Sequence, residues 1–389
     1  MRKNFNIFII IGLIIGIIFG VFFPKLMQEL SFLGVIYINL LKFIIIPILF
    51  TSISITINKS VKKGSKLIIK TVVLFIVMFI MSFLITSLIV TLINPSKGFN
   101  YQLKDWDGTL TSFKMTDIVT NLFPSNIIDI FQNNLILPGI ILAMFFGIYA
   151  DKVKNGNKVI DLLEGLKNIF NKLLEDIILL TPIGVFSLVG NTVATYGISI
   201  IKYGLKYIGI AYFSSIIVLF FIMILPVWFF AKINPITYIK KVSKVWLITL
   251  TTCSSMATLP YTIKTCKEGF NIPSKTTDIV VPLGCTIHMC GGAVSFALLG
   301  LFNATLFGIK ITLTTYLLML VVATFINMAA PGIPGGGIVI GATYLSYFNI
   351  PLSFIGFYSG IYKLLDMAYT TLNVTGDITA NILINKMNK

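Results

Sequence analysis

Residues 363–380 read KLLDMAYTTLNVTGDITA, a polar stretch in an otherwise strongly apolar chain. It carries two carboxylates, Asp366 and Asp377, together with Thr370 and Asn373. Steps of three or four residues place these four side chains on one face of a helix. Because a charge in hydrocarbon is costly, we expect this face to line a wet cavity and to bind something there. The alternative is a cytoplasmic amphipathic tail helix, which the apolar residues on both sides of the stripe disfavour.

The composition predicts an all-α polytopic membrane protein. The chain has 389 residues, of which 56% are hydrophobic and 11% charged, and its mean hydropathy is +0.94. A soluble domain cannot bury that much apolar surface. The net charge of +16 reflects lysines that we expect on one side of the membrane, and it does not indicate a nucleic-acid partner. The single arginine, Arg2, precedes the first apolar run, so no guanidinium is available at mid-membrane to bind a carboxylate or phosphate bidentately.

Apolar runs in the first 230 residues predict six crossings. The first lacks a small-residue cleavage site and is long enough to be an uncleaved helix. Thr181-Pro182 predicts a kink. If the N-terminus is cytoplasmic, the three lysine-rich segments between these runs all fall on the cytoplasmic side, as the positive-inside rule requires. The predicted spans are 4–23, 32–57, 72–93, 127–149, 177–195 and 207–230, and the lysine-rich segments are 59–70, 151–172 and 232–244.

Two later segments are apolar but interrupted. Residues 245–263 are broken by TTCSS and Pro260, with lysines at both ends, and residues 311–345 are broken by AAPGIPGGG at 329–337. Such backbone survives at membrane depth only where protein or a water cavity satisfies it. Each segment precedes a polar full-length helix, predicted at 276–301 and 354–383. Two re-entrant hairpins in these positions are typical of secondary transporters, with the binding site between them. The alternative, two Pro-kinked ordinary helices, is disfavoured by the Gly-Gly-Gly run.

The cysteines do not predict a disulfide framework or a metal centre. All four fall within or beside the predicted membrane segments. On a continuous helix Cys285 and His288 share a face, whereas Cys290 points elsewhere. The remaining two are Cys253 and Cys266.

Four motifs, in order, resemble the dicarboxylate/amino acid:cation symporter family, the glutamate transporter homologues. They are TCSSMATLP (252–260), PLGCTIHMCGG (282–292), PGIPGGG (331–337) and LLDMAYTTLNVTGD (364–377). LFPSNIIDI (122–130) and TPIGVFSL (181–188) also resemble that family, so the likeness covers essentially the whole chain.

The resemblance implies eight transmembrane helices, two opposed re-entrant hairpins, and a homotrimer with an elevator motion. It divides the chain into scaffold helices 1 and 2 (1–70), transport-domain helix 3 (71–95), an extracellular loop (96–120), scaffold helices 4 and 5 (121–200) and a transport domain (201–389). Within the last part, hairpin 1 is expected at about 245–264 and hairpin 2 at about 311–347.

The resemblance also implies the site residues for an amino acid. Asp366 matches the ligand of the substrate ammonium, while Asn373, Ser254 and Ser255 match the groups that bind its α-carboxylate. Free N–H groups at a hairpin tip suit an anion. The further substrate contacts implied are Thr370, Tyr369, Gly292, Ile333 and Pro334.

About two sodium ions are implied as coupling ions. Asp377 and the carbonyls of Gly284, His288 and Asn373 match the first sodium site, and a hard cation prefers such oxygen ligands. The third site is dismantled, because its aspartate is Cys290 here and its hydroxyls are replaced by apolar residues around Phe75, Met78 and Phe79. The second site matches the carbonyls of Thr286, Asn327, Met328 and Ala330.

Two substitutions point to a neutral substrate. Acidic-substrate members have an arginine where this chain has Tyr369, and a threonine where it has Gly292. Only Lys363 remains as a cation near the pocket; it either snorkels to the surface or supports Asp366. Tyr369 could hydrogen-bond a hydroxyl or stack on an apolar group. We expect the His288 ring merely to pack while its carbonyl binds sodium, with titration of the ring as the alternative.

The sequence therefore predicts sodium-coupled import of small neutral amino acids, similar to serine, threonine or alanine. The expected location is the inner (plasma) membrane, in contact with lipid and with both termini cytoplasmic. Alternatives are a proton-coupled carrier, a carrier of a larger neutral amino acid such as cystine, a dicarboxylate or glutamate symporter, and a substrate-gated anion channel. No Ser/His, Asp/Asp or HExxH arrangement predicts an enzyme.

Overall fold

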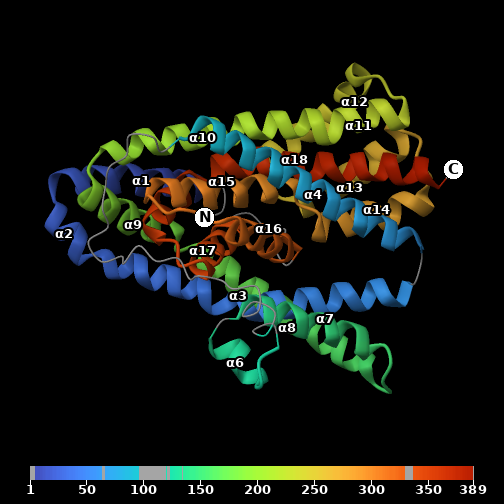
Figure 1. The fold of residues 1–389 in the computed structure, drawn as a ribbon, viewed down its shortest axis with the longest axis horizontal. Coiled ribbons are helices and arrows are strands. Elements are labelled where there is room, and N and C mark those ends of the chain that lie inside the picture. Colours follow the sequence, from blue (N-terminus) through green and yellow to red (C-terminus); the bar gives the residue numbers. More distant parts are fainter. Residues whose placement is uncertain are drawn as a thin grey trace.

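The computed structural model describes residues 5–63, 66–95, 120, 123–133, 135–328 and 336–388, and in this part of the chain it contains helices and no strands (Figure 1). The first half comprises α1 (Phe5–Phe22), α2 (Pro24–Glu29), α3 (Ser31–Lys63), α4 (Lys66–Ile93), α6 (Ile127–Gln132), α7 (Ile136–Ala150), α8 (Gly156–Ile178) and α9 (Thr181–Tyr196). The second half comprises α10 (Ser199–Val218), η2 (Leu219–Ile224), α11 (Leu225–Ala231), α12 (Pro235–Thr252), α13 (Ser255–Lys264), η3 (Thr265–Gly269), α14 (Ser274–Ile287), α15 (Cys290–Leu306), α16 (Leu313–Met328), α17 (Gly336–Tyr347), η4 (Leu352–Phe354) and α18 (Ile355–Met387).

The prediction of a helical membrane protein with several apolar helices is confirmed. In the described part of the chain, four helical stretches are long and apolar enough to cross a membrane, at residues 24–59, 66–93, 200–231 and 274–306. Helices α8 and α9 meet at an angle of 54° and count as a fifth if they form one bent span. That bend lies at the predicted Thr181-Pro182 kink, where Pro182 is the second residue of α9. The lysine-rich segment before it, expected as a loop, is largely the helix α8.

Glycines allow α1 to lie very close to α9. Gly12, Gly16 and Gly20 are spaced four residues apart on one face of α1. A Cβ on any of them would lie 2.5–2.7 Å from a carbonyl oxygen of α9. Small residues at this spacing are a common device for packing helices in membranes, where close backbone approach supplies van der Waals contact.

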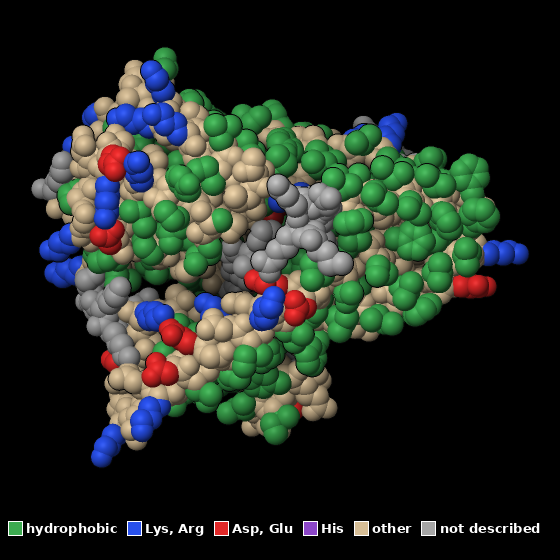
Figure 2. All heavy atoms as spheres, turned by 180° about the vertical axis from the view of Figure 1, so that it is seen from behind, with side chains coloured by type: hydrophobic (Ala, Val, Ile, Leu, Met, Phe, Trp, Pro, Cys, Tyr) green, Lys and Arg blue, Asp and Glu red, His purple; other side chains and the backbone are tan. Residues whose placement is uncertain are grey.

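The lysine-rich segments gather at one end of the molecule. The α3–α4 junction, the α7–α8 turn, the α11–α12 turn and the C-terminus lie at the same end (Figure 1). Figure 2 shows Lys and Arg side chains concentrated at this end, whereas hydrophobic side chains cover much of the surface away from it. This polarity is the one that the positive-inside rule predicts for a membrane protein.

The first interrupted segment forms the helix pair α12–α13. The chain reverses at Cys253, whose φ of 48° is in the left-handed region, and at Ser254, which is extended. Ser254 then caps α13, because its Oγ accepts a hydrogen bond from the N–H of Ala257 at 3.2 Å. Helix α12 begins at Pro235, about ten residues before the predicted start of hairpin 1. In the second interrupted segment, α16 and α17 flank residues 329–335, which lie outside the described residues.

The span predicted at 276–301 is present at residues 274–306, but it is divided into two helices, so the expectation of an uninterrupted helix is wrong. Helix α14 ends at Ile287 and α15 begins at Cys290, with an extended His288 and a non-helical Met289 between them. The side chain of Asn373 supplies the reason, because its Oδ1 accepts a hydrogen bond from the backbone N–H of Gly291 at 2.8 Å. This N–H at the start of α15 therefore has a partner without a preceding helical turn. Gly291 and Gly292 also have low helix propensity.

Helix α18 forms the centre of the second half. Nearly all of its side chains from Ile355 to Ile384 are buried. It packs against α10, α12, α14 and α15, and also against α9. A helix that is buried over most of its surface and still carries two buried carboxylates must satisfy them within the protein.

Candidate functional site

A pocket lies where the start of α13, the start of α15, the end of α16 and the middle of α18 meet. Among the described residues that line it, Asp366 is the only one with a charged side chain; none is Lys, Arg or His. Its walls are formed by Cys253, Ser255, Met289, Gly292, Ser295, Phe296, Asn327, Gly337, Ile340, Tyr362, Asp366, Tyr369, Thr370 and Asn373.

Asp366 presents a buried carboxylate to this pocket. Its side chain is 7% exposed, and the hydroxyl of Thr370 donates a hydrogen bond to its Oδ1 at 2.9 Å. The two residues are one helical turn apart on α18, as their spacing predicts. A carboxylate held in this way is positioned to bind a cationic group that enters the pocket.

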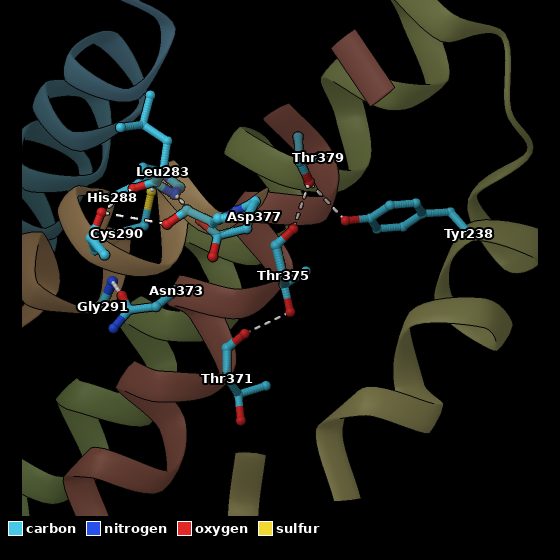
Figure 3. Close-up of polar contacts among 12 residues, drawn as sticks. Tyr238, Leu283, His288, Cys290, Gly291, Thr371, Asn373, Thr375, Asp377 and Thr379 are labelled. Carbon is cyan, nitrogen blue, oxygen red and sulfur yellow. Dashed lines mark hydrogen bonds and ion pairs between the residues drawn. The ribbon is translucent and has the colours of Figure 1, made fainter. Parts of the chain in front are cut away.

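Asn373 has a fixed amide orientation. A backbone N–H can only donate, so the contact between Gly291 N and Asn373 Oδ1 identifies the oxygen (Figure 3). The amide Nδ2 of Asn373 therefore points away from Gly291. Because Asn373 also lines the pocket, it offers two N–H donors for an anionic group.

The tip of the α12–α13 pair lies at the same pocket. Ser255, the first residue of α13, is buried and lines it, whereas Ser254 serves as the helix cap. The first N–H groups of a helix lack intrahelical partners and carry a partial positive charge. The α13 start and the Asn373 amide together suit a carboxylate.

Two helix ends in the same region suit a cation instead. Helix α14 ends at Ile287 and α16 ends at Met328, and both residues line a second, smaller hollow together with Asn327 and Phe75. The last carbonyls of a helix have no intrahelical donors and carry a partial negative charge. The described residues of the predicted second sodium site, Thr286, Asn327 and Met328, lie at these ends, so the donor set fits a hard cation. Ala330 of the same predicted site lies outside the described residues.

Asp377 of the predicted first sodium site contacts an imidazole. His288 Nδ1 lies 2.9 Å from Asp377 Oδ1, and His288 Nε2 lies 3.1 Å from the thiol of Cys290 (Figure 3). The ring also stacks on Phe75, with centroids 4.4 Å apart and an angle of 16° between the planes. When Asp377 is ionised it can only accept, and in that state the ring donates from Nδ1 and its Nε2 accepts from the thiol. The expectation that the ring merely packs is therefore wrong.

These contacts decide how well a metal ion fits around Asp377. A carboxylate and the carbonyls at the end of α14 are ligands that sodium prefers. One of those carbonyls, that of Gly284, already accepts a hydrogen bond from the backbone N–H of His288 at 2.8 Å. Asp377 Oδ1 is likewise in contact with Nδ1 of the His288 ring. The remaining oxygens fit one cation. A further cation near Phe75, Met78 and Phe79 does not fit, because these buried apolar side chains offer no oxygen ligand and the imidazole stacks on Phe75.

The structure corrects the expected direction of Cys290. Because the helix breaks at His288 and Met289, the thiol of Cys290 contacts His288 instead of pointing elsewhere. Cys285 is separate from this cluster, with its sulfur 3.3 Å from that of Met256. All four cysteines are free and buried, and no group of three or more metal-binding side chains occurs in the described part of the chain.

One pocket residue was not predicted through its side chain. Asn327 was assigned only a backbone carbonyl, yet its side chain is buried in the wall of the pocket. A Cβ on Gly292 would lie 2.0 Å from its Oδ1, so the glycine and the asparagine fit each other. The signal available in the sequence was a single amide in an apolar run, immediately before the glycine-rich break. Of the other predicted contacts, Ile333 and Pro334 lie outside the described residues.

Comparisons with known proteins cover nearly the whole chain. A family model described as "Sodium:dicarboxylate symporter family" matches residues 5–387. A "Proton/glutamate-aspartate symporter" of Bacillus subtilis (strain 168) is 27% identical over 100% of this chain and 96% of the relative. A "Proton/sodium-glutamate symport protein" of Geobacillus stearothermophilus is 28% identical over 93% of this chain and 89% of the relative. A "C4-dicarboxylate transport protein 1" of Ralstonia nicotianae is 27% identical, over 93% and 87% respectively.

Proposed function

Because the chain belongs to the sodium:dicarboxylate symporter family and is a cation-coupled symporter of the membrane, we propose that it imports small neutral amino acids together with sodium. The observation that carries this proposal is the charge of the pocket. Its described lining contains one carboxylate, Asp366, and no cationic side chain. A zwitterion matches that arrangement, since its ammonium balances the single carboxylate.

Different pocket residues bind the two charged groups of the amino acid. Asp366, oriented by Thr370, accepts the substrate ammonium, while the amide of Asn373 donates to the α-carboxylate. The N–H groups at the start of α13, beside Ser255, provide the second contact for that carboxylate. Each substrate charge thus meets a group of opposite polarity in a site that excludes most water.

An acidic side chain has no comparable partner. In a buried site, an unpaired carboxylate costs on the order of several kcal/mol, which is more than a single neutral hydrogen bond returns. The relatives are named for glutamate, aspartate and C4-dicarboxylates. The present chain has Tyr369 and Gly292 where acidic-substrate members are expected to have arginine and threonine, and this difference supports a neutral substrate.

Competition for uptake tests the proposal. We expect unlabelled alanine or threonine to inhibit uptake of labelled serine by proteoliposomes, and excess glutamate to leave it unchanged. Strong inhibition by glutamate would contradict the proposed specificity. In the converse variant, Tyr369→Arg, we expect glutamate to become a competitor, because a guanidinium would then face the substrate side chain. Adding Gly292→Thr would displace Asn327, so the single substitution is the informative one.

We infer two sodium ions per amino acid. One is held by the oxygens near Asp377 and the other by the carbonyls at the ends of α14 and α16. Each sodium ion supplies the positive charge that balances these oxygens. The sodium gradient supplies the driving force for uptake. Two sodium ions with a zwitterion carry two positive charges inward, so an inside-negative potential should accelerate uptake. Reversal potentials in proteoliposomes should give a ratio of two; a ratio of three would show that a further cation binds despite the imidazole at Phe75.

A proton-coupled carrier is the second candidate. The contact of His288 with Asp377 favours it, because a histidine beside a carboxylate is a common proton relay. Two relatives are also named for protons. Uptake without sodium that follows an imposed pH gradient, and that is lost in His288→Gln, would select this candidate over sodium coupling.

The proposed architecture is a homotrimer with a fixed scaffold and a moving transport domain, in a plasma membrane with both termini cytoplasmic. The helix packing supports the division, since α1 packs on α9 and α3 packs on α7, α8 and α9, whereas α4, α14, α15 and α18 pack together. The C-terminus lies at the lysine-rich end, which supports a cytoplasmic C-terminus (Figures 1 and 2).

A further inference from the structure

The side chain of Asn327 is buried without a partner for its oxygen. Asn327 is the penultimate residue of α16 and is 1% exposed. Its Oδ1 has no hydrogen-bond partner among the described residues. A buried carbonyl oxygen that makes no hydrogen bond loses its hydrogen bonds to water, and no protein hydrogen bond offsets this desolvation cost. Such a group in a binding pocket requires an explanation.

Gly292 gives this amide its access to the pocket. Asn327 and Gly292 both line the pocket, and a Cβ at position 292 would lie 2.0 Å from Asn327 Oδ1. Any larger residue at 292 would therefore push the amide away. The neighbouring Gly291 lies equally close to the backbone of Tyr369 on α18, where a Cβ would lie 2.2 Å from the carbonyl oxygen. The two glycines thus bring the start of α15 between α16 and α18.

A second polar group lines the same pocket. The hydroxyl of Tyr369 is buried, meets the geometry of a hydrogen bond with none of the described residues, and lies beside the hydroxyls of Tyr207 and Ser295. Tyr369 precedes Thr370, the residue that orients Asp366. The pocket therefore contains a zwitterion-binding part at Asp366 and Asn373, and beside it the unpaired acceptor of Asn327 and the hydroxyl of Tyr369.

We propose that Asn327 binds the substrate side chain through Oδ1, and that the substrate therefore carries a hydrogen-bond donor on a short neutral side chain, a hydroxyl or a carboxamide. The hydroxyl of Tyr369 donates to the oxygen of the same group. This inference rests on the proposed function and narrows it: serine, threonine and asparagine are the preferred substrates, and alanine binds more weakly. A site built to pair with a substrate donor rejects the analogue that lacks it, because its own acceptor is then left unpaired.

Matched pairs of amino acids test the inference on the wild-type protein. We expect serine to bind about 10- to 100-fold more tightly than alanine, and threonine to exceed 2-aminobutyrate by a similar factor. Calorimetry on the purified protein in sodium measures both ratios. Equal affinities within both pairs would overturn the role of Asn327 while leaving a neutral substrate in place. Tight binding of glutamate would instead overturn the proposed function.

Two asparagine-to-leucine variants distinguish a loss of contacts to the substrate side chain from a general loss of stability. Asn327→Leu keeps the size of the side chain and removes the amide, so we expect the serine-to-alanine ratio to fall to about 1 while alanine still binds. The control is Asn303→Leu, because Asn303 is also buried with an unpaired Oδ1 but does not line the pocket. We expect that control to keep the wild-type ratio. An unchanged ratio in Asn327→Leu would contradict the proposal, even if both absolute affinities fell.

Discussion

Asp366→Asn is expected to abolish substrate binding while the protein still folds and inserts. The carboxylate is buried, accepts a hydrogen bond from Thr370, and is the one charged group in the described lining of the pocket. Removing one partner of a buried ion pair costs about 3–5 kcal/mol, which corresponds to at least 100-fold in affinity. An asparagine keeps the shape and can still accept from Thr370. Calorimetry with serine measures the effect.

The matched control for this substitution is Asp278→Asn. Asp278 lies on α14 at the lysine-rich end, is half exposed, and pairs with Lys267 at 2.8 Å. A surface ion pair of this kind contributes little, so this variant should bind serine with wild-type affinity. If Asp366→Asn bound serine as tightly as the control, the ammonium of the substrate would have to bind elsewhere.

Asp377→Asn should remove transport together with its dependence on sodium. Asp377 is 1% exposed and supplies the one carboxylate near the carbonyls at the end of α14. The asparagine oxygen can still accept the hydrogen bond from His288, so the local fold should persist. The negative charge is lost, however, and the remaining neutral oxygens bind a hard cation much less tightly. Serine uptake driven by an imposed sodium gradient should fall by on the order of 100-fold.

Counterflow exchange at equal sodium on both sides provides a second measurement for this variant. It requires substrate binding and movement but no net driving force, so it separates a loss of coupling from a loss of the protein. Full gradient-driven uptake with wild-type sodium dependence in Asp377→Asn would show that the coupling ion binds away from Asp377.

The stripe on α18 is the part of the site that the sequence predicts best. Asp366, Thr370, Asn373 and Asp377 follow helical spacing, and the contact of Thr370 with Asp366 needs only one turn of a helix. The apolar composition and the two interrupted segments likewise predict a helical membrane protein of the transporter class. These features depend on local pattern, which a single sequence contains.

The break between α14 and α15 could not be predicted in the same way. PLGCTIHMCGG is apolar enough for one continuous helix, and the group that replaces the missing helical partner is the amide of Asn373, 82 residues away. The contacts of His288 with Asp377 and Cys290 follow from that break, since a straight helix would separate His288 from Cys290. The unpaired oxygen of Asn327 could not be predicted either, because it also depends on a tertiary contact, the close approach of Gly292 to Asn327.

Thermal stability of the purified protein with single amino acids, with and without sodium, tests the central claim most directly. A ligand that binds only the folded state raises the melting temperature in proportion to its occupancy. A carrier that couples a neutral amino acid to sodium should be stabilised by serine or threonine in sodium, much less in an equal concentration of choline, and not by glutamate, aspartate or succinate in either salt. Stabilisation by glutamate or succinate, with none by serine, would contradict it.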